Sequence, residues 1–214
     1  MHVNFIKKLK ICYLILGLSF LNITFVYSAQ TAEEYYNSGN LDCKHGDYIE
    51  AISDYTKAIK INPKFAKAYN NRGLANLNVL NLNDSLSDFN KAIQFDSELE
   101  VAYFNRGVLY RKKKKLSQAI IDFTKAIEIN PNDSDVYRNR AIAYGIQSKF
   151  KEAISDLTTS IQIEPKQAEG YYDRGVIYQE QGKFVQSISD YSKTIEINPR
   201  YAKTYIKRAF DVIY

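Results

Sequence analysis

The fold is decided by a short stretch that recurs along the chain, Ala126-Ile127-Glu128-Ile129-Asn130-Pro131. Closely similar residues stand at 58–63 and 194–199. The four prolines of the chain are separated by 68, 34 and 34 residues: Pro63, Pro131, Pro165 and Pro199. A fixed period of this length is the sequence signature of a repeat architecture, in which one supersecondary unit is copied along the chain.

Working outward from these stretches, the period divides most of the chain into 34-residue units. Numbering each unit from 1 to 34 places proline at position 32, and an Arg-Gly or Arg-Ala pair at positions 7 and 8 of units two to six. Residues 32–201 form five full units, 32–65, 66–99, 100–133, 134–167 and 168–201, and a partial sixth unit occupies 202–214. We therefore expect one repeat domain.

The residue types within a unit predict two helices. Positions 4, 8 and 11 fall on one helical face, and positions 20, 24, 27 and 28 fall on another. Position 4 is tyrosine in every unit, position 8 is Gly or Ala, and position 24 is a large apolar or aromatic residue, except that the short sixth unit ends earlier. Small residues let two helices approach and large ones fill the space, so we expect the position 4 tyrosines in the core. Turn-forming residues near positions 13–16 separate the helices, and the proline ends the second one.

With these motifs in register, residues 32–214 resemble the tetratricopeptide repeat family. The resemblance implies an all-α fold, a right-handed superhelical solenoid of antiparallel helix pairs, with a concave groove lined by the first helix of each unit. Ser97 departs from the pattern by replacing proline, and Asp42 and Asn76 stand where a large apolar residue is usual. We therefore expect a looser exit from the second unit and less tight packing in the first.

A regular set of charges suggests how the units dock. Position 23 is Asp in all five full units, and position 7 is Arg in units two to six. Pairing within a unit would leave the first Asp and the last Arg unmatched, so each Asp is predicted to pair with the Arg of the following unit. The predicted pairs are Asp54–Arg72, Asp88–Arg106, Asp122–Arg140, Asp156–Arg174 and Asp190–Arg208. The last pair would dock residues 202–214 as a C-terminal capping helix.

The resemblance also indicates where a partner would bind. In the family, positions 2, 5, 6, 9 and 13 of the first helix face the groove. An asparagine amide both donates and accepts, so a row of them suits an extended peptide backbone, and aromatic rings suit its side chains. The candidate partner-binding residues are Asn71, Asn105, Asn139, Phe104, Tyr172, Asn40 and Arg138. The alternative is that these asparagines are simply solvated.

A full carboxylate clamp is not expected. Some family members grip the C-terminal carboxylate of a partner with Lys, Asn, Asn, Lys and Arg at set positions. The first three units match only the two asparagines, and in the last three units Asp173 stands among the cations Arg138, Lys203 and Lys207. An anionic terminus requires those positive charges.

The first 28 residues have the composition of an export signal. Lys7, Lys8 and Lys10 precede an apolar run, and small residues follow near Ser28. This order predicts a signal peptide at 1–28, cleaved after Ser28, followed by a short segment at 29–31 and an exported protein that is periplasmic or secreted. An uncleaved membrane anchor at residues 11–27 is the alternative, and it would be the chain's contact with a membrane.

Composition argues against several other functions. The three leader lysines account for more than half of the net charge of +5, which leaves a nearly neutral body and no reason to expect nucleic acid as a partner. Two cysteines and two histidines make a metal site or catalytic centre implausible, and no sequence motif indicates a cofactor. Cys43 is interpreted as a small helix residue or, if exposed, a redox thiol. The basic run 111–115 is either a solvated turn or an anionic docking patch.

These observations predict a non-enzymatic, exported interaction module that binds a peptide or protein in its groove. The first alternative is an assembly component that forms a weak homodimer through 202–214, where Ile206, Phe210 and Ile213 make an apolar cap. The second is an envelope chaperone or adaptor tethered by its leader.

Overall fold

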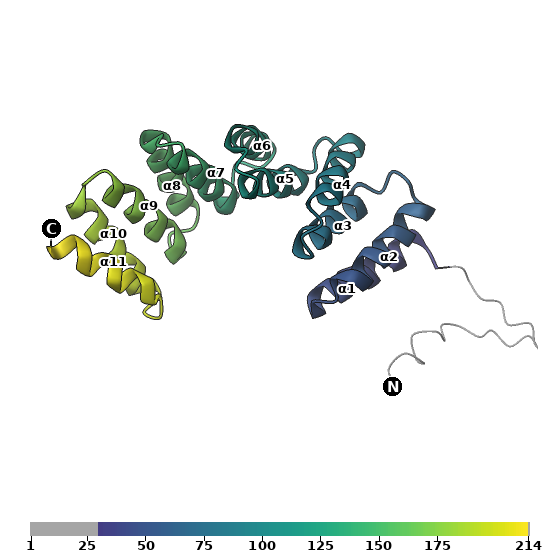
Figure 1. The fold of residues 1–214 in the computed structure, drawn as a ribbon, viewed down its shortest axis with the longest axis horizontal. Coiled ribbons are helices and arrows are strands. Elements are labelled where there is room, and N and C mark those ends of the chain that lie inside the picture. Colours follow the sequence, from purple (N-terminus) through teal and green to yellow (C-terminus); the bar gives the residue numbers. More distant parts are fainter. Residues whose placement is uncertain (1–29, 214) are drawn as a thin grey trace, which may run out of the picture.

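A computed structural model describes residues 30–213 of the chain (Figure 1). The predicted signal peptide at 1–28 and the alternative anchor at 11–27 lie outside these residues. Among residues 30–213, no helix has both the length and the apolar character that a membrane span requires.

Eleven α-helices and no strands make up the described part of the chain. They are α1 (Ala32–His45), α2 (Tyr48–Ile61), α3 (Ala66–Asn78), α4 (Leu82–Phe95), α5 (Glu100–Lys112), α6 (Leu116–Ile129), α7 (Ser134–Ile146), α8 (Phe150–Ile163), α9 (Ala168–Glu180), α10 (Phe184–Ile197) and α11 (Ala202–Ile213). Each odd-numbered helix begins at the first residue of a unit. The predicted all-α array of helix pairs is confirmed.

The helix pairs stack side by side into an arch with one hollow side (Figure 1). Each odd-numbered helix packs on the even-numbered helix that follows it, and each even-numbered helix packs on the first helix of the next unit. The odd-numbered helices from α1 to α9 also contact one another from unit to unit, as the inner layer of a curved stack does. They therefore line the concave side, which we call the groove.

Close approach of the two helices in a unit depends on position 8. A Cβ atom added to Gly107 would lie 2.7 Å from Cε1 of Phe123, and the same collision would occur between Gly73 and Phe89 at 2.8 Å. In the fourth unit, Ala141 occupies position 8, and position 24 is Leu157, which is smaller than the Phe or Tyr of the other units. Both residues are buried. The small residue and the large one are thus matched to each other within each unit.

The position 4 tyrosines are not in the core, contrary to expectation. They are half-buried, and Tyr205 is 42% exposed. The guanidinium carbon of Arg72 lies 5.5 Å from the centre of the Tyr69 ring, and the corresponding distance is 5.7 Å from Arg106 to Tyr103. In units two to six the ring thus packs under the arginine three residues further on, one helical turn away, whereas Lys57 lies over Tyr35 in the first unit. The large side chains at position 24 are the ones buried in the core instead, each at most 1% exposed: Tyr55, Phe89, Phe123, Leu157 and Tyr191.

The turn between the two helices of a unit has one conformation throughout. Position 15 has a positive φ in all five full units, at Gly46 (84°), Leu80 (64°), Lys114 (57°), Ser148 (59°) and Gly182 (70°). The next residue donates its N–H to the carbonyl of position 11, which satisfies an otherwise unpaired helix-end carbonyl. Only two of these five positions carry the glycine that favours this backbone, so the other three turns are strained.

The exit of the second unit keeps its shape without proline. Asp96 Oδ1 accepts from the Glu98 N–H at 3.0 Å, as Asn62 Oδ1 accepts from Lys64 and Asn130 Oδ1 from Asn132. The side chain before position 32 thus holds this turn, and the expected loosening at Ser97 does not occur. Asp42, on which the expected loose packing of the first unit was based, is buried, and so is Asn76, whose amide donates to Asp88 Oδ2 at 3.2 Å.

Candidate functional site

The predicted inter-unit ion pairs are wrong. Arg106 donates from Nε and Nη2 to both carboxylate oxygens of Asp122, at 2.8 and 2.7 Å, and Asp122 belongs to the same unit. The same two-bond arrangement joins Arg72 to Asp88, Arg140 to Asp156, and Arg174 to Asp190. We call these four pairs the Arg–Asp ladder. The predicted partners Asp54–Arg72, Asp88–Arg106, Asp122–Arg140, Asp156–Arg174 and Asp190–Arg208 are therefore replaced by pairs within single units.

The two ends of the ladder explain why the prediction failed. Asp54 forms its ion pair with a lysine instead of an arginine, because Lys57 Nζ on the same helix lies 2.7 Å from its carboxylate. Arg208 donates to the Ser192 hydroxyl at 3.4 Å and has no carboxylate partner among the described residues. Pairing within units was rejected because it leaves the first Asp and the last Arg without each other's partner type. The structure has this arrangement: Asp54 pairs with a lysine, and Arg208 bonds to a serine.

The arginines nevertheless link successive units through neutral side chains. Nη1 of Arg72 donates to the Thr56 hydroxyl of the preceding unit at 3.0 Å, and Nη1 of Arg106 donates to Asn90 at 2.7 Å. Position 25 supplies the acceptor each time: Thr56, Asn90, Thr124, Thr158 and Ser192. This run of hydroxyl and amide residues is the sequence signal that the charge-based prediction missed.

The ladder and the groove occupy different sides of the first helices. Positions 7 and 9 are separated by two residues, which turns their side chains about 160° apart around a helix. The ladder therefore stabilises the stack, and the surface available to a partner is formed by other residues. Those residues differ between the two arms of the arch.

In the first three units, the groove is lined by a network of amides. Asn71 Nδ2 donates to Tyr36 Oη at 3.1 Å and to Asn40 Oδ1 at 2.8 Å. Asn70 Nδ2 donates to Asn71 Oδ1, and Asn105 Nδ2 donates to Asn70 Oδ1, each at 3.0 Å. The network joins α1, α3 and α5 across the inner layer. Since Asn70 and Asn105 are buried, it fixes the spacing of these helices as well as lining the groove.

In the fourth and fifth units, charged groups replace the amides. Arg138 donates to Asp135 at 3.1 Å and to Asp173 of the next unit at 3.4 Å. Arg111, at the end of α5, donates from Nη2 to Asn139 Oδ1 at 3.1 Å, and Asn139 Nδ2 donates to the Asp135 carbonyl at 2.8 Å. We call these five residues, drawn from α5, α7 and α9, the charged cluster.

Burial shifts the pKa values within this cluster. It lowers the pKa of Arg111, and the like charge of Arg138 lowers it further. It also raises the pKa of Asp173, although the Arg138 guanidinium acts in the opposite sense. Burial alone would lower the pKa of Arg138, but Asp173 and Asp135 outweigh it and the pKa is raised. Two carboxylates thus compensate Arg138, whereas the Asp173 charge acts on Arg111 too weakly to offset burial and the like charge of Arg138.

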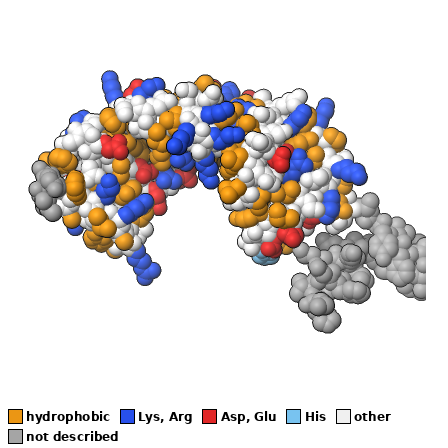
Figure 2. Space-filling view, in the orientation of Figure 1, with side chains coloured by type: hydrophobic (Ala, Val, Ile, Leu, Met, Phe, Trp, Pro, Cys, Tyr) orange, Lys and Arg blue, Asp and Glu red, His pale blue; other side chains and the backbone are white. Residues whose placement is uncertain are grey.

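The C-terminal end of the groove carries two lysines. Lys203 Nζ lies 4.4 Å from the centre of the Tyr172 ring and 4.9 Å from that of Tyr201. Lys207 Nζ donates to Gln179 Oε1 at 2.8 Å. Figure 2 shows Lys and Arg side chains gathered on the hollow side near the middle of the arch, with Asp and Glu toward its C-terminal arm.

The structure places the predicted groove residues on the inner layer but leaves them unequally accessible. Asn105 and Asn139 are only 7% and 8% exposed, whereas Asn40, Asn71 and Arg138 are half-buried. The rings of Phe104 and Tyr172 pack against the core rings Phe123 and Tyr191, with centres 6.0 and 5.9 Å apart. Two accessible apolar residues at positions 9 and 2, Leu74 and Val101, are 40% and 38% exposed and were not among the predicted contact residues.

Cys43 shows no sign of a reactive site. The sulfur of Cys43 accepts from Tyr55 Oη at 3.5 Å and is half-buried, as a small helix residue would be.

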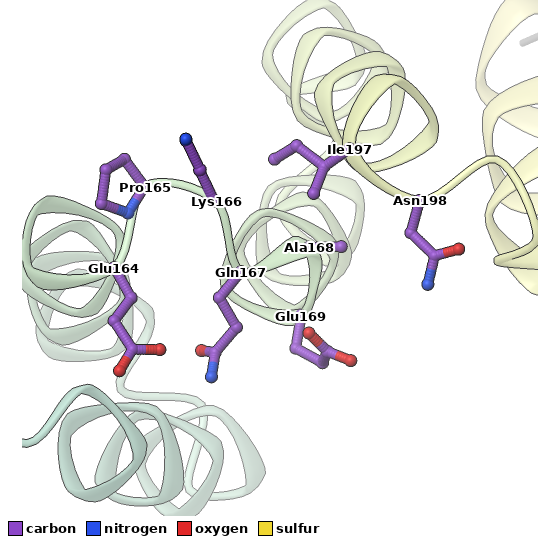
Figure 3. A pocket seen from close by; sticks show the side chains of 8 residues that line it. All are labelled: Glu164, Pro165, Lys166, Gln167, Ala168, Glu169, Ile197 and Asn198. Atoms are coloured by element: carbon purple, nitrogen blue, oxygen red, sulfur yellow. The ribbon is translucent and has the colours of Figure 1, made fainter.

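A shallow depression of about 700 Å³ lies between the start of α9 and the end of α10, and it is lined by residues 164–169 with Ile197 and Asn198. In Figure 3 its Glu164, Gln167 and Glu169 side chains point the same way while Lys166 points away, so they do not converge on one point. Residues 30–213 contain no cluster of His, Cys, Asp and Glu that could hold a metal ion.

Comparisons with known proteins agree with this geometry. Family models described as tetratricopeptide repeat match residues 101–133, 168–201 and 123–155, and one described as TPR repeat matches 39–79. No curated protein shows a significant match to the chain.

Several solved structures share the fold. YrrB, characterised as a TPR protein with an unusual peptide-binding site, is 21% identical with a TM-score of 0.69, covering 83% of this chain and 92% of its own. MamA is 23% identical with a TM-score of 0.69, covering 77% of this chain and 96% of its own. PilF from Pseudomonas aeruginosa is 17% identical with a TM-score of 0.75, covering 82% of this chain and 80% of its own. At these identities the likeness concerns the fold.

Together, the family models cover more than half of the chain, and the helix pairs, the matched positions 8 and 24 and the curved inner layer have the form that those models describe. The chain belongs to the tetratricopeptide repeat family and has the architecture of a protein–protein interaction module.

Proposed function

We propose that the protein binds an extended peptide segment of a partner protein along its groove, without a reaction of its own. The observation that carries the proposal is that the inner layer changes from unit to unit while the stacking contacts do not. Leu74 and Val101 offer exposed apolar surface beside the amide network, and Phe104 and Tyr172 offer half-buried rings. The relative YrrB, with its unusual peptide-binding site, supports this use of the fold.

The asparagine row has a more limited part in this proposal. Asn71, Asn105 and Asn139 each donate to a neighbouring group in the chain, and Asn139 also accepts from Arg111. A peptide backbone would have to compete with these bonds or use the acceptor sites that remain. Contact between the peptide and this row stays a prediction, and we assign the first contacts to the more exposed groove residues.

Site-specific photo-cross-linking tests the proposal. A benzoylphenylalanine placed at Leu74 or Val101 reports on the groove, and one placed at Ile121 or Val185, which are 66% and 81% exposed on even-numbered helices, is the matched control. We expect a partner to be captured from the source cells by the groove positions and not by the controls. Equal capture by all four positions would contradict binding in the groove.

We also propose that the protein is exported. The support is the order of basic, apolar and small residues in the first 28 positions. Mass spectrometry of the N-terminus of the native protein should show a chain that begins at Ala29. A full-length chain that stays in the membrane pellet after an alkaline carbonate wash would instead indicate the tethered adaptor.

Assembly through the C-terminal cap is a second candidate function. Ile206 and Phe210 of α11 are 75% and 50% exposed, and within residues 30–213 Arg208 has no carboxylate partner of the kind that its counterparts have. A second copy could cover this face. Light scattering after size exclusion should then show a dimer that Ile206→Ser converts to a monomer, and a monomeric wild type would contradict the assembly role.

A further inference from the structure

Two tyrosine rings at the C-terminal end of the groove hold a cation of the chain itself. Tyr172 on α9 and Tyr201, which precedes α11, have ring centres 5.2 Å apart, and we call them the tyrosine pair. Lys203 Nζ lies 4.4 and 4.9 Å from the two centres. The next shortest such distance among the described residues is 5.2 Å, from Lys57 to Tyr35. The face of an aromatic ring attracts a cation, so the tyrosine pair is a favourable place for one.

Lys203 is held at this place by weak contacts. Ladder arginines also lie beside tyrosine rings, but Arg106 near Tyr103 donates two hydrogen bonds to Asp122 as well. Within residues 30–213, Lys203 makes no ion pair with a carboxylate, and the residue is exposed. A long lysine side chain loses rotamer freedom when it is fixed on a surface. Another cation can therefore replace it at a small cost.

Two carboxylates of α9 lie next to the tyrosine pair. Glu169 and Asp173 are one helical turn apart on the side of the helix that carries Tyr172. Burial raises the pKa of Asp173, and the charges of Arg138 and Lys203 oppose that rise, so the Asp173 carboxylate acts directly on the lysine. This arm of the arch also carries the Asp and Glu side chains visible in Figure 2. The local charge thus favours a cation.

These carboxylates retain free acceptor oxygens. Arg138 donates to Oδ2 of Asp173, whereas Oδ1 has no hydrogen bond with the described residues. Neither Asp173 Oδ1 nor the carboxylate of Glu169 is among the buried unpaired atoms of residues 30–213, so both reach solvent. A cation that enters the groove beside the rings would find accessible oxygens to accept its hydrogen bonds.

The N-terminal end of the groove provides a comparison, because it has the same ring positions. Tyr36 and Phe65 have ring centres 4.9 Å apart, and Lys67 follows two residues later, as a lysine does at the C-terminal end. Among the described residues, no lysine or arginine lies over these two rings. Position 6 of the first unit is Asn37, where the fifth unit has Asp173. The comparison indicates that the neighbouring carboxylate, and not the rings alone, favours a cation.

We propose that the tyrosine pair, Glu169 and Asp173 form a cation-binding subsite of the groove, which takes an arginine or lysine side chain of a bound peptide in place of Lys203. Lys203 is an internal competitor that fills the subsite when no peptide is present. This inference rests on the proposed groove function and names the charge that the peptide carries. Arginine is the better ligand, because its planar guanidinium stacks on a ring and donates two parallel bonds to a carboxylate.

NMR can follow the displacement of Lys203 directly. Reductive methylation with carbon-13 labels the lysines and keeps their charge, and the signal missing from Lys203→Ala identifies Lys203. The ring currents of the tyrosine pair should shift this signal upfield of the exposed lysines. A capped nonapeptide of alternating Leu and Gly with a central Arg should move it to their position, and the same peptide with the neutral isostere citrulline should not. A signal that the Arg peptide leaves in place, or that both peptides move equally, would overturn the subsite.

Fluorescence anisotropy of the same peptides, labelled with one dye, locates the effect. The wild type should bind the Arg peptide about ten times more tightly than the citrulline peptide, with a Lys peptide between them. Lys203→Ala empties the subsite and should bind the Arg peptide about three times more tightly again, whereas Lys67→Ala, the matched lysine of the N-terminal end, should not. An unchanged or weaker affinity in Lys203→Ala would overturn the role of Lys203 as a competitor.

Changes in the ring separate contact from long-range charge. Tyr201→Leu should remove the preference for the Arg peptide, and Tyr201→Phe, which keeps the ring, should retain it. If the gain of Lys203→Ala persists in combination with Tyr201→Leu, Lys203 acts through its charge alone, which contradicts the subsite. Capture by the groove cross-linkers together with equal affinity for the Arg and citrulline peptides would reject the subsite and leave the groove function standing. Absence of capture together with displacement of Lys203 would reject the groove function instead.

Discussion

The Arg–Asp ladder and the groove lie on different sides of the same helices, and they differ in how closely their units agree. In the ladder, the same two bonds to Asp and the same bond to position 25 recur, and the four carboxylates are 3–7% exposed. In the groove, position 6 is a bonded amide in α3, α5 and α7, Asp173 in α9 and Lys207 in α11.

The difference follows from what each side must contact. The ladder is packed against the preceding helix pair, so every unit has to present the same shape and charge to its neighbour. The groove faces solvent, so its side chains are free to differ and to match a partner that is not itself periodic. Repetition therefore marks the residues that hold the fold, and departure from repetition marks the residues to examine for function.

The largest change in stability is expected from a substitution that breaks the ladder at its centre. Arg106→Ala leaves the Asp122 carboxylate, 3% exposed, without its two strongest bonds, and should cost about 3–5 kcal/mol of unfolding free energy in urea titration. Arg200→Ala, an exposed arginine outside the ladder, should change the value by less than about 0.5 kcal/mol. A cost for Arg106→Ala below about 1 kcal/mol would show that the ladder behaves as a surface ion pair.

A second prediction tests the matched positions that let the helices approach. Gly107→Ala places a Cβ 2.7 Å from Phe123 Cε1 and should cost about 1–3 kcal/mol. The fourth unit uses Ala141 with Leu157, so adding Phe123→Leu to the Gly107→Ala variant should cost less than the two single changes combined. Additive costs in this double-mutant cycle would contradict the matching of positions 8 and 24.

A third prediction uses the strained turn beside the groove. Lys114 has φ of 57°, so Lys114→Gly should raise the unfolding free energy by about 0.5–1 kcal/mol. Lys113→Gly changes the neighbouring lysine at φ of −80° and should lower it instead. A gain in both variants would mean that loss of positive charge, rather than backbone strain, is responsible.

The smallest expected effect concerns the groove, and it is the pH dependence of stability that Asp173 produces. Because burial raises the Asp173 pKa, the folded state binds this proton more tightly than the unfolded chain does. Wild-type stability should therefore decrease as pH rises from the ordinary aspartate pKa through the raised one. Asp173→Asn should lack that decrease, with a difference below about 1 kcal/mol, since Arg138 partly offsets the burial. Parallel stability curves for the two proteins between pH 3 and 7 would contradict it.

The sequence by itself determined the unit length, the all-α class and the start of every first helix. Hydrophobic and small residues recur with the helical period, and this pattern depends only on which face of a helix is buried. It also singled out the correct charged residues of the ladder, whereas the groove positions of Asn71, Asn105 and Asn139 came from the resemblance to the family.

The tertiary structure alone decided which of these groups meet. Whether Asp88 pairs with Arg72 or Arg106 depends on how two helices cross within a unit and between units, and position numbers carry no such distance. The same holds for Arg111, which belongs to a basic run in the sequence and to the groove in the fold. Local periodicity fixes the direction of a side chain, but its partner is set by the packing of helices that lie far apart in the chain.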